Sequence, residues 1–467
     1  MSANSKAGSD PQPPNLGGTK RGSFGSKLGI VLATAGSAVG LGNVWRFPYM
    51  AGENGGAAFI LVYIVCILLL GVPGMIGEFV VGRYAQTNAA RAYDILSRGK
   101  PWKLVGYLGI LTGTIILGFY AVVAGWCLEY LLASIAGQLQ GDAEAVKNYF
   151  TTFSSNPLKP VIWGVAFILV THVVVIFGVR KGIERASKWL MPILLILLLV
   201  LVVASCLLPH AMEGVKFLFE PDFSKVDRRV FLDALGQAFF SLSLGTACLC
   251  TYASYFSKTT NLLRSAGQIA LLDTVIAILS GLMIFPAAFS VGVNPDSDPS
   301  LIFITLPNVF QQAFGALPLA GYLISIMFYA LLVFAALTST ISMHEIGTAF
   351  FTEEFHLPRM KSAWIPTIIA SVLCVFCSWS VGAYDIQVLG LPLMDFCDML
   401  TADYMLPLGG FFTCMFVGWY IPKKIVHTEF TNDGQFNHRF FNIYLFAVRY
   451  VCPIAIMLVF LHQLGVI

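Results

Sequence analysis

The chain has 467 residues, of which 57% are hydrophobic and only 11% are charged. Soluble proteins carry roughly 25% charged residues, so this composition excludes a soluble globular fold and indicates a protein that crosses a membrane several times. The net charge of +3 is small for so long a chain. We therefore expect the chain to lie in a lipid bilayer and to bind no nucleic acid.

The first 26 residues are rich in Gly, Ser, Pro and Lys, and they predict a disordered tail. Apolar stretches follow that are long enough to cross a bilayer, which takes about 20 residues per helix. They predict an all-α membrane protein with eleven transmembrane helices, at approximately residues 29–50, 57–82, 104–134, 160–178, 189–208, 231–256, 267–293, 319–350, 362–381, 391–421 and 440–463.

The basic residues are distributed unevenly between the two sides of these stretches. Most Lys and Arg residues lie in the N-terminal segment and in the even-numbered connections. Cytoplasmic connections are enriched in Lys and Arg, so we expect the N-terminus in the cytoplasm and the C-terminus, at Ile467, outside. The odd-numbered connections hold six, which are Lys147, Lys159, Lys216, Lys225, Arg228 and Arg229.

Two of the stretches are interrupted by glycine and small polar residues, at Gly36–Asn43 and at Phe239–Gly245. Glycine weakens a helix, and serine offers its backbone competing hydrogen bonds. A broken helix at membrane depth is tolerated only where it lines a cavity. Interrupted helices at matching positions of two halves predict the binding site of a secondary transporter.

Other chemistries are poorly supported by the sequence. Motifs of serine hydrolases, zinc proteases and phosphate-binding loops are absent from it, so we expect no enzyme. Cys374 and Cys377 have no second Cys or His pair at zinc spacing, and we interpret them as packing residues.

Several motifs resemble the neurotransmitter:sodium symporter family, in order and at compatible spacing over residues 21 to about 463. They are Asn43-Val44-Trp45-Arg46-Phe47-Pro48-Tyr49, Glu53-Asn54-Gly55-Gly56, Gly77-Glu78-Phe79, Lys181-Gly182-Ile183-Glu184-Arg185, Thr251-Tyr252-Ala253-Ser254-Tyr255 and Leu337-Thr338-Ser339-Thr340.

The resemblance implies two inverted five-helix repeats, at 27–208 and 209–421, followed by an eleventh helix at 422–467. It implies that the first and sixth helices are unwound. The implied function is sodium-coupled import of an L-amino acid across a bacterial plasma membrane by alternating access. A transport-inactive amino-acid sensor on the same fold is the alternative. The oligomeric state is left open.

The resemblance also assigns a substrate site and two sodium sites. Tyr120 would donate its hydroxyl to the substrate carboxylate, although an interfacial or packing tyrosine is the alternative. The substrate residues would be Ser37, Ala38, Gly40, Leu41, Gly42, Ile116, Tyr120, Phe240, Ser241, Ser243, Thr246, Ser339 and Met343. The first sodium would be bound by Ala38, Asn43, Ser241 and Asp273. The second would be bound by Gly36, Val39, Ala335, Thr338 and Ser339.

Asp273 departs from one bacterial leucine-transporting member of the family, which has asparagine here and an acid one turn later, where this chain has Ala277. A charge at this depth is costly unless it is paired, and sodium is a suitable partner. We therefore expect no requirement for chloride. Proton counter-transport through Asp273 is a further hypothesis. An aspartate bonded only to neighbouring hydroxyls is the structural alternative.

The resemblance also implies gates, formed by paired charges, on both sides of this site. Outside, Arg46 would pair with Asp395, with Asp398 as a rival. Inside, Arg21 would pair with Glu353, while Phe24 plugs the path and Tyr255 braces it. Glu78 would brace the unwound backbone. Gly182 and Pro192 would let the fifth helix unwind, although Pro192 is also compatible with a simple helix start.

The side-chain pocket is the least specific prediction. By the resemblance, Thr246 replaces a bulky residue, often phenylalanine, that is found there in the leucine-transporting member. Met343 is flexible and repacks around varied shapes. A large hydrophobic or aromatic L-amino acid is therefore expected to fit best, and smaller or polar amino acids or a non-proteinogenic substrate are the alternatives.

Overall fold

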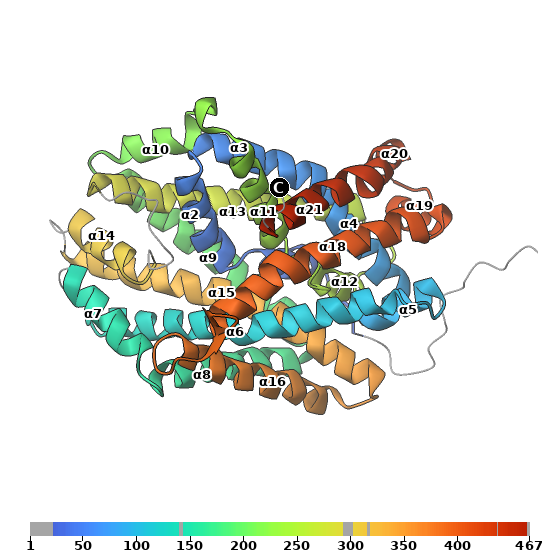
Figure 1. Ribbon diagram of the computed structural model, residues 1–467, viewed down its shortest axis with the longest axis horizontal. Helices are drawn as coiled ribbons and strands as arrows, with labels where there is room; N and C mark the ends of the chain where they lie inside the picture. The colour runs from blue at the N-terminus through green and yellow to red at the C-terminus, as the bar shows by residue number, and fades with distance from the viewer. Residues whose placement is uncertain (1–21, 140–142, 293–301, 315–317, 437, 465–467) are drawn as a thin grey trace, which may run out of the picture.

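The computed structural model describes residues 22–139, 143–292, 302–314, 318–436 and 438–464, and these form a single bundle of helices (Figure 1). The first half contains α1 (Lys27–Ala38), η1 (Gly42–Arg46), α2 (Phe47–Glu53), α3 (Ala57–Cys66), η2 (Ile67–Gly71), α4 (Val72–Ala85), α5 (Ala89–Ser97), α6 (Lys103–Ile135), α7 (Ala143–Ser154), α8 (Lys159–Ile176), η3 (Val179–Glu184), α9 (Arg185–Cys206) and α10 (Ala211–Phe219).

The second half contains η4 (Phe223–Lys225), α11 (Arg228–Ser241), α12 (Cys248–Ala253), α13 (Leu262–Ser290), α14 (Thr305–Ala313), α15 (Pro318–Glu354), α16 (Arg359–Ser380), β1 (Gln387–Val388), β2 (Leu391–Pro392), α17 (Leu393–Met399), η6 (Leu400–Met405), α18 (Leu406–Met415), η7 (Phe416–Tyr420), α19 (Lys423–Thr431), α20 (His438–Phe446), η8 (Ala447–Val451) and α21 (Cys452–Gln463). The short elements η1, η2, η3, η6, η7 and η8 are π-helical turns, whereas η4 is a 3-10 turn.

Nine helical segments of the described chain are long and apolar enough to cross a membrane, and α1 with η1–α2 forms a tenth that bends by 56°. These ten match the predicted stretches other than 231–256. That sixth stretch is divided into α11 and α12 by the non-helical residues 242–247. The one predicted spanning helix that is not continuous is therefore the sixth, which the sequence predicted to be broken.

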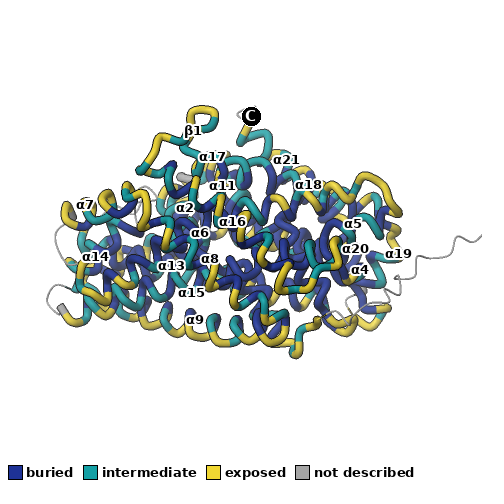
Figure 2. Tube along the Cα trace, turned by 90° about the horizontal axis from the view of Figure 1, so that it is seen from below, coloured by how far each residue is buried: buried dark blue, intermediate teal, exposed yellow. Residues whose placement is uncertain are grey.

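Apolar side chains cover both the inside and the outside of this bundle. The buried set runs through the middle of the molecule, and exposed residues follow its rim (Figure 2). Exposed residues of α3, η2, α8 and α9 include Leu68, Leu69, Ile162 and Ile196. Because a bilayer solvates such side chains, this outer surface is the one expected to face lipid.

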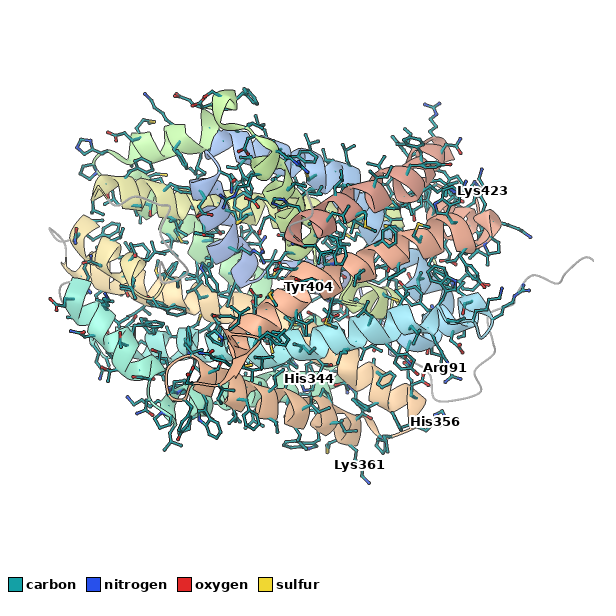
Figure 3. All side chains as sticks on the ribbon, in the orientation of Figure 1. Arg91, His344, His356, Lys361, Tyr404 and Lys423 are labelled. Carbon is teal, nitrogen blue, oxygen red and sulfur yellow. The ribbon has the colours of Figure 1, made fainter. Side chains whose placement is uncertain are left out.

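The two ends of the bundle carry different short elements. Helices α7 and α14 lie at one end, whereas α5 and α19 lie at the opposite end (Figure 1). Arg91, Lys361 and Lys423 project at the end that carries α5 and α19 (Figure 3). We refer to it as the basic end.

A buried cluster at the basic end joins segments that are far apart in the sequence. Arg83, at the end of α4, is almost fully buried, and its Nε lies 2.6 Å from Oε2 of Glu429 on α19. Its guanidinium also donates to the backbone carbonyls of Thr260 and Glu429 and to Oδ1 of Asn432. Lys258 completes the cluster through Oε1 of Glu429, at 3.0 Å. We call this set the Arg83 cluster.

Two features refine the sequence-based picture. A short hairpin, β1–β2, precedes α17 in an otherwise helical protein. The fifth helix is wound from Arg185 to Cys206, with Pro192 inside α9, and Gly182 lies in the π-helical turn η3 that precedes it. The unwinding expected between these two residues is therefore not a property of the conformation described.

Candidate ion and substrate site

The site begins where the two interrupted helices meet. Helix α1 ends at Ala38, and α11 ends at Ser241, so both lose their helical hydrogen bonds in the same region. Ser243 adopts a left-handed conformation, with φ of 54°, and its hydroxyl donates to the carbonyl of Ser37 at 3.1 Å. This bond ties the two breaks directly to each other.

Glu78 holds the break between α11 and α12. Its carboxylate accepts from the backbone N–H of Gly245 at 2.7 Å and from that of Cys250 at 3.3 Å. Gly245 lies in the non-helical segment, and Cys250 lies in the first turn of α12, so their N–H groups have no partner within a continuous helix. A buried N–H without an acceptor would be costly. The predicted bracing role of Glu78 is confirmed for the sixth helix.

Asn43, Ser241 and Asp273 come together from three helices. The amide Nδ2 of Asn43 lies 2.7 Å from Oδ1 of Asp273 and 3.2 Å from the Ser241 hydroxyl. That hydroxyl lies 3.0 and 2.9 Å from the two carboxylate oxygens, and the carboxylate is fully buried. Hard cations such as sodium prefer oxygen ligands, and this cluster supplies them next to a built-in negative charge.

One detail of this cluster bears on how it would bind a cation. Oδ1 of Asn43 accepts from the N–H of Gly40 at 3.1 Å, while the amide NH₂ faces Asp273. A cation beside the carboxylate would need the oxygen of Asn43, not its NH₂. Binding through Asn43 therefore requires its amide group to rotate.

A second group of oxygens lies between α1 and α15. The Thr338 hydroxyl is 3.2 Å from the carbonyl oxygen of Val39 and 2.9 Å from that of Ala335, and the Ser339 hydroxyl is 3.4 Å from Val39. A Cβ added to Gly36 would lie 3.3 Å from Cβ of Thr338, so glycine permits the close approach of the two helices. The five residues predicted for the second sodium site are thus adjacent.

Tyr120 meets the broken part of the first helix. Its hydroxyl accepts from the N–H of Leu41 at 3.0 Å. A side chain on Gly40 would contact the Tyr120 and Ser339 hydroxyls. Tyr120 thus faces the unwound backbone and is not an interfacial residue.

A cavity of 540 Å³ borders the break in the first helix, and its lining is mostly aromatic and apolar. Leu41, Gly42, Tyr120 and Phe240 belong to it, together with Trp126 and Phe303 and with Arg46, Asp395 and Asp398. Four of the predicted substrate residues therefore line the same space as the predicted outer gate. The nine others lie outside its lining, namely Ser37, Ala38, Gly40, Ile116, Ser241, Ser243, Thr246, Ser339 and Met343.

The Thr246 hydroxyl is occupied locally. It donates to the Ser243 carbonyl at 2.8 Å and accepts from the Cys248 N–H at 3.2 Å, at the start of α12. Its effect on a pocket would therefore come from its small volume. Helix α6 approaches the same segment through glycine, because a Cβ on Gly109 would lie 2.6 Å from that of Ala247.

The predicted outer gate is assembled without a direct ion pair. The Arg46 guanidinium lies 4.4 Å from the centre of the Phe240 ring, a cation–π arrangement. Within the part of the chain that the structure describes, no ion pair of 4.0 Å or less joins Arg46 to Asp395 or Asp398. Their pairing stays a prediction.

At the opposite side of the site, Arg21 lies outside the described residues. Its predicted partner Glu353 accepts from the Thr87 hydroxyl at 2.7 Å and from the Asn88 N–H at 2.6 Å. Phe24 packs edge-on against the rings of Tyr252 and Tyr255, with centroids 5.9 and 6.2 Å away. Phe24 thus contacts Tyr255, and its role as a plug stays a prediction.

Sequence reasoning missed two sets of partners. The Tyr63 hydroxyl on α3 donates to Oδ2 of Asp273 at 3.1 Å. The Tyr255 hydroxyl donates to Glu345 at 2.7 Å, and Glu345 is fully buried and paired with Arg359. Buried tyrosine hydroxyls usually need a partner, so Tyr63 within an apolar stretch was the available signal. Glu345 lies on α15 between the motif residues and Glu353, and no spacing rule singled it out.

Broken helices that converge on buried oxygen clusters, beneath an apolar cavity inside a helical membrane bundle, define the class of secondary transporters. The comparisons with known proteins agree with this class. The model of the sodium:neurotransmitter symporter family matches residues 21–152 and 157–467, and this chain belongs to that family. It is therefore a sodium-dependent symporter and a multi-pass membrane protein, in a family of transporters rather than enzymes.

The relatives include bacterial and animal transporters. The uncharacterized sodium-dependent transporter YhdH of Bacillus subtilis is 39% identical over 447 residues, which cover 95% of this chain and 98% of the relative. The sodium-dependent dopamine transporter of Bos taurus is 27% identical over 430 residues, which cover 80% of this chain and 60% of the dopamine transporter. The crystal structure of MhsT in complex with L-phenylalanine superposes with a TM-score of 0.86, at 41% identity, over 95% of this chain and all of MhsT.

Proposed function

We propose that this symporter imports a large hydrophobic or aromatic L-amino acid together with sodium. The observation that carries the proposal is the cavity whose lining includes Leu41, Gly42, Tyr120 and Phe240. Freed backbone groups and the Tyr120 hydroxyl suit the ammonium and carboxylate of an amino acid. The aromatic walls suit a large apolar side chain. The complex of MhsT with L-phenylalanine supports the same substrate class.

Two sodium ions are proposed as the coupling ions. The first would lie at Asn43, Ser241, Asp273 and the Ala38 carbonyl. The second would lie at Gly36, Val39, Ala335, Thr338 and Ser339, where hydroxyl and carbonyl oxygens already converge. Because both groups touch the broken first helix, binding of the ions and of the substrate would be coupled through one segment of backbone.

Chloride independence is proposed from the charge of Asp273. A fixed carboxylate beside the first ion site supplies the negative charge that a bound anion would otherwise contribute. In the inward-releasing state, loss of sodium would remove the positive partner of this carboxylate, and a proton would then replace the ion. The proposed cycle therefore exchanges inward sodium for outward protons.

The proposed placement has the basic end in the cytoplasm of a bacterial plasma membrane, with inverted repeats at 27–208 and 209–421. Arg91, Lys361 and Lys423 at one end support this orientation through the positive-inside rule (Figure 3).

The test is uptake by the purified full chain in proteoliposomes. An inward sodium gradient should drive accumulation of L-phenylalanine and L-leucine, and a potassium gradient should not. Competition by all twenty amino acids should rank large apolar ones first. Sodium-dependent binding without any accumulation would instead identify the sensor alternative. Preferential displacement by glycine or alanine would contradict the assigned substrate class.

A further inference from the structure

A second hollow lies away from the transport site, at the basic end. It has a volume of 790 Å³ and lies where the residues before α1 meet η3 and the start of α9. Four cations line it, namely Arg180, Lys181, Arg185 and Lys188. None of the transport residues described above belongs to this lining.

The charge of this hollow is largely uncompensated. Its carboxylate, Glu184, is buried and already engaged: it accepts from the Gly25 N–H at 2.6 Å and the Ser26 hydroxyl at 2.9 Å, and it pairs with Lys188 at 2.6 Å. Among the described residues, no ion pair neutralises the exposed side chains of Arg180, Lys181 and Arg185. The hollow thus presents three positive charges to an anion.

An exposed apolar stripe starts at the same place. Trp189, which lines the hollow, is 67% exposed, and it is followed along one face of α9 by Ile193, Ile196, Val200 and Val203, all exposed. Spacings of three and four residues place them on a single face of the helix. Phe177, at the end of α8, is exposed on the rim of the hollow. Aromatic residues beside basic ones are typical of the membrane–water interface.

We propose that this hollow binds the phosphate headgroup of an anionic phospholipid, whose acyl chains lie along the exposed face of α9. Guanidinium groups suit phosphate oxygens because they donate several hydrogen bonds in a planar fork. The apolar stripe explains why a lipid is favoured over a soluble phosphate, since it offers a surface for the chains that a soluble anion lacks.

The site also touches the beginning of the first helix. A Cβ on Gly25 would lie 2.7 Å from Nε of Arg180, so the backbone before α1 rests against this guanidinium. Ser26 caps α1 and bonds to Glu184. An anion that holds Arg180 and Arg185 in place would therefore stabilise the docking of the α1 start onto α9. This proposal goes beyond the substrate assigned above and does not depend on it.

The experiment measures the thermal unfolding midpoint of the full chain in neutral detergent as lipid is titrated. Phosphatidylglycerol should raise the midpoint at lower concentration than phosphatidylcholine does. The variant Arg180→Gln/Lys181→Gln/Arg185→Gln should need on the order of a hundredfold more phosphatidylglycerol, because each basic residue contributes roughly fivefold. The matched control Arg98→Gln/Lys103→Gln/Lys361→Gln removes three exposed cations of the same end and should behave as the parent.

Two further arms decide the ligand and guard against misfolding. Inorganic phosphate at the same concentration should give no protection, and equal protection by phosphate would overturn the assignment to a lipid. The single variant Arg185→Gln should show a smaller shift in the same direction if the triple variant does not fold. Unchanged preference for phosphatidylglycerol in Arg185→Gln, or an equal loss in the control variant, would overturn the site.

Discussion

Asp273 is fully buried on α13, and its donors come from separate elements: Asn43 on η1, Ser241 on α11 and Tyr63 on α3. A carboxylate within a membrane is costly unless neighbouring groups compensate it. Here hydrogen bonds from the protein can do so, and they come from the helices whose breaks form the site. The charge state of this one residue is therefore linked to the relative positions of four helices.

Replacing Asp273 with Asn should expose the anion requirement that the carboxylate replaces. Sodium-driven uptake by the parent should be the same in chloride and in gluconate. Asp273→Asn should lose at least about tenfold in sodium affinity, since it removes a charged ligand, and chloride should restore part of the uptake. Uptake of labelled substrate into proteoliposomes in the two media measures both effects.

Tyr63→Phe is the matched control, because it removes one hydrogen bond to the same carboxylate and leaves its charge. It should acquire no response to chloride. A parent that stops transporting without chloride would show that Asp273 does not serve as the internal anion.

Thr338→Val tests the second group of oxygens, since valine keeps the shape of threonine and removes the hydroxyl. The half-saturating sodium concentration should rise about tenfold, as expected for the loss of one buried polar partner worth roughly 1–2 kcal/mol. Thr340→Val is the control. Its hydroxyl bonds to Thr171 at 2.9 Å and to the carbonyl of Leu337, away from Val39. Equal sodium dependence in Thr338→Val and the parent would exclude this ion site.

At the scale of elements, the break in the sixth helix depends on a single carboxylate. Glu78→Gln leaves one oxygen for two N–H groups and turns an NH₂ toward the other, which should cost about 1–3 kcal/mol. We expect a lower thermal unfolding midpoint together with weaker sodium-dependent substrate binding.

Glu129→Gln makes the same chemical change on α6 and serves as the control for Glu78→Gln. Its remaining oxygen can still accept from the Tyr149 hydroxyl, which lies 2.8 Å away in the parent. This control should bind substrate normally. Normal binding by Glu78→Gln as well would show that the break holds without this brace.

The positions of the breaks could be predicted from the sequence, whereas their partners could not. Glycine and serine within apolar stretches mark weakened helix at Gly36 and Ser243, and family motifs then place Thr338 and Asp273 nearby. The bonds of Tyr63 and Glu345 depend on how α3 and α15 are rotated against their neighbours. Long apolar helices offer little periodic signal for that rotation, because lipid outside and protein inside select similar side chains.

At the scale of the whole molecule, Phe24 packs against Tyr252 and Tyr255 before the start of α1, where the inner gate is predicted. Tyr255→Phe removes the hydroxyl that bonds to Glu345 and keeps the ring, so it should raise the population of the inward-open state. The apparent affinity for sodium and substrate is proportional to the fraction of protein in the outward-facing state. If losing the bond destabilises that state by about 1 kcal/mol or less, the apparent affinity should fall about two- to fivefold. Equilibrium binding in detergent at several sodium concentrations measures it.

Tyr252→Phe provides the comparison for that measurement, because it also alters a tyrosine that packs on Phe24. It should leave the apparent affinity unchanged. If both variants lose affinity equally, the effect belongs to the aromatic packing and not to the bond with Glu345.

The bundle as a whole was predictable because its signals are long: ten of the eleven apolar stretches appear as spanning segments, counting the bent first one. The sixth stretch does not appear as one spanning segment, because it is divided into α11 and α12, and each of these is too short to cross a bilayer alone. The conformation was not predictable, since the Gly182 and Pro192 pattern allows the fifth helix to unwind and α9 is wound throughout. Sequence specifies which states are accessible, while packing decides which one is populated.

The Arg83 cluster has a consequence for biosynthesis. Arg83 is made early, but its partner Glu429 follows 346 residues later. Until α19 emerges, the guanidinium lacks its carboxylate, and a buried charge without its partner costs roughly 3–5 kcal/mol. A nascent chain that has released only the first helices therefore has reason to keep the end of α4 in water. Insertion of the end of α4 into the bundle then becomes one of the last events of assembly. An incomplete chain would expose this end of α4, and quality-control proteases could recognise it.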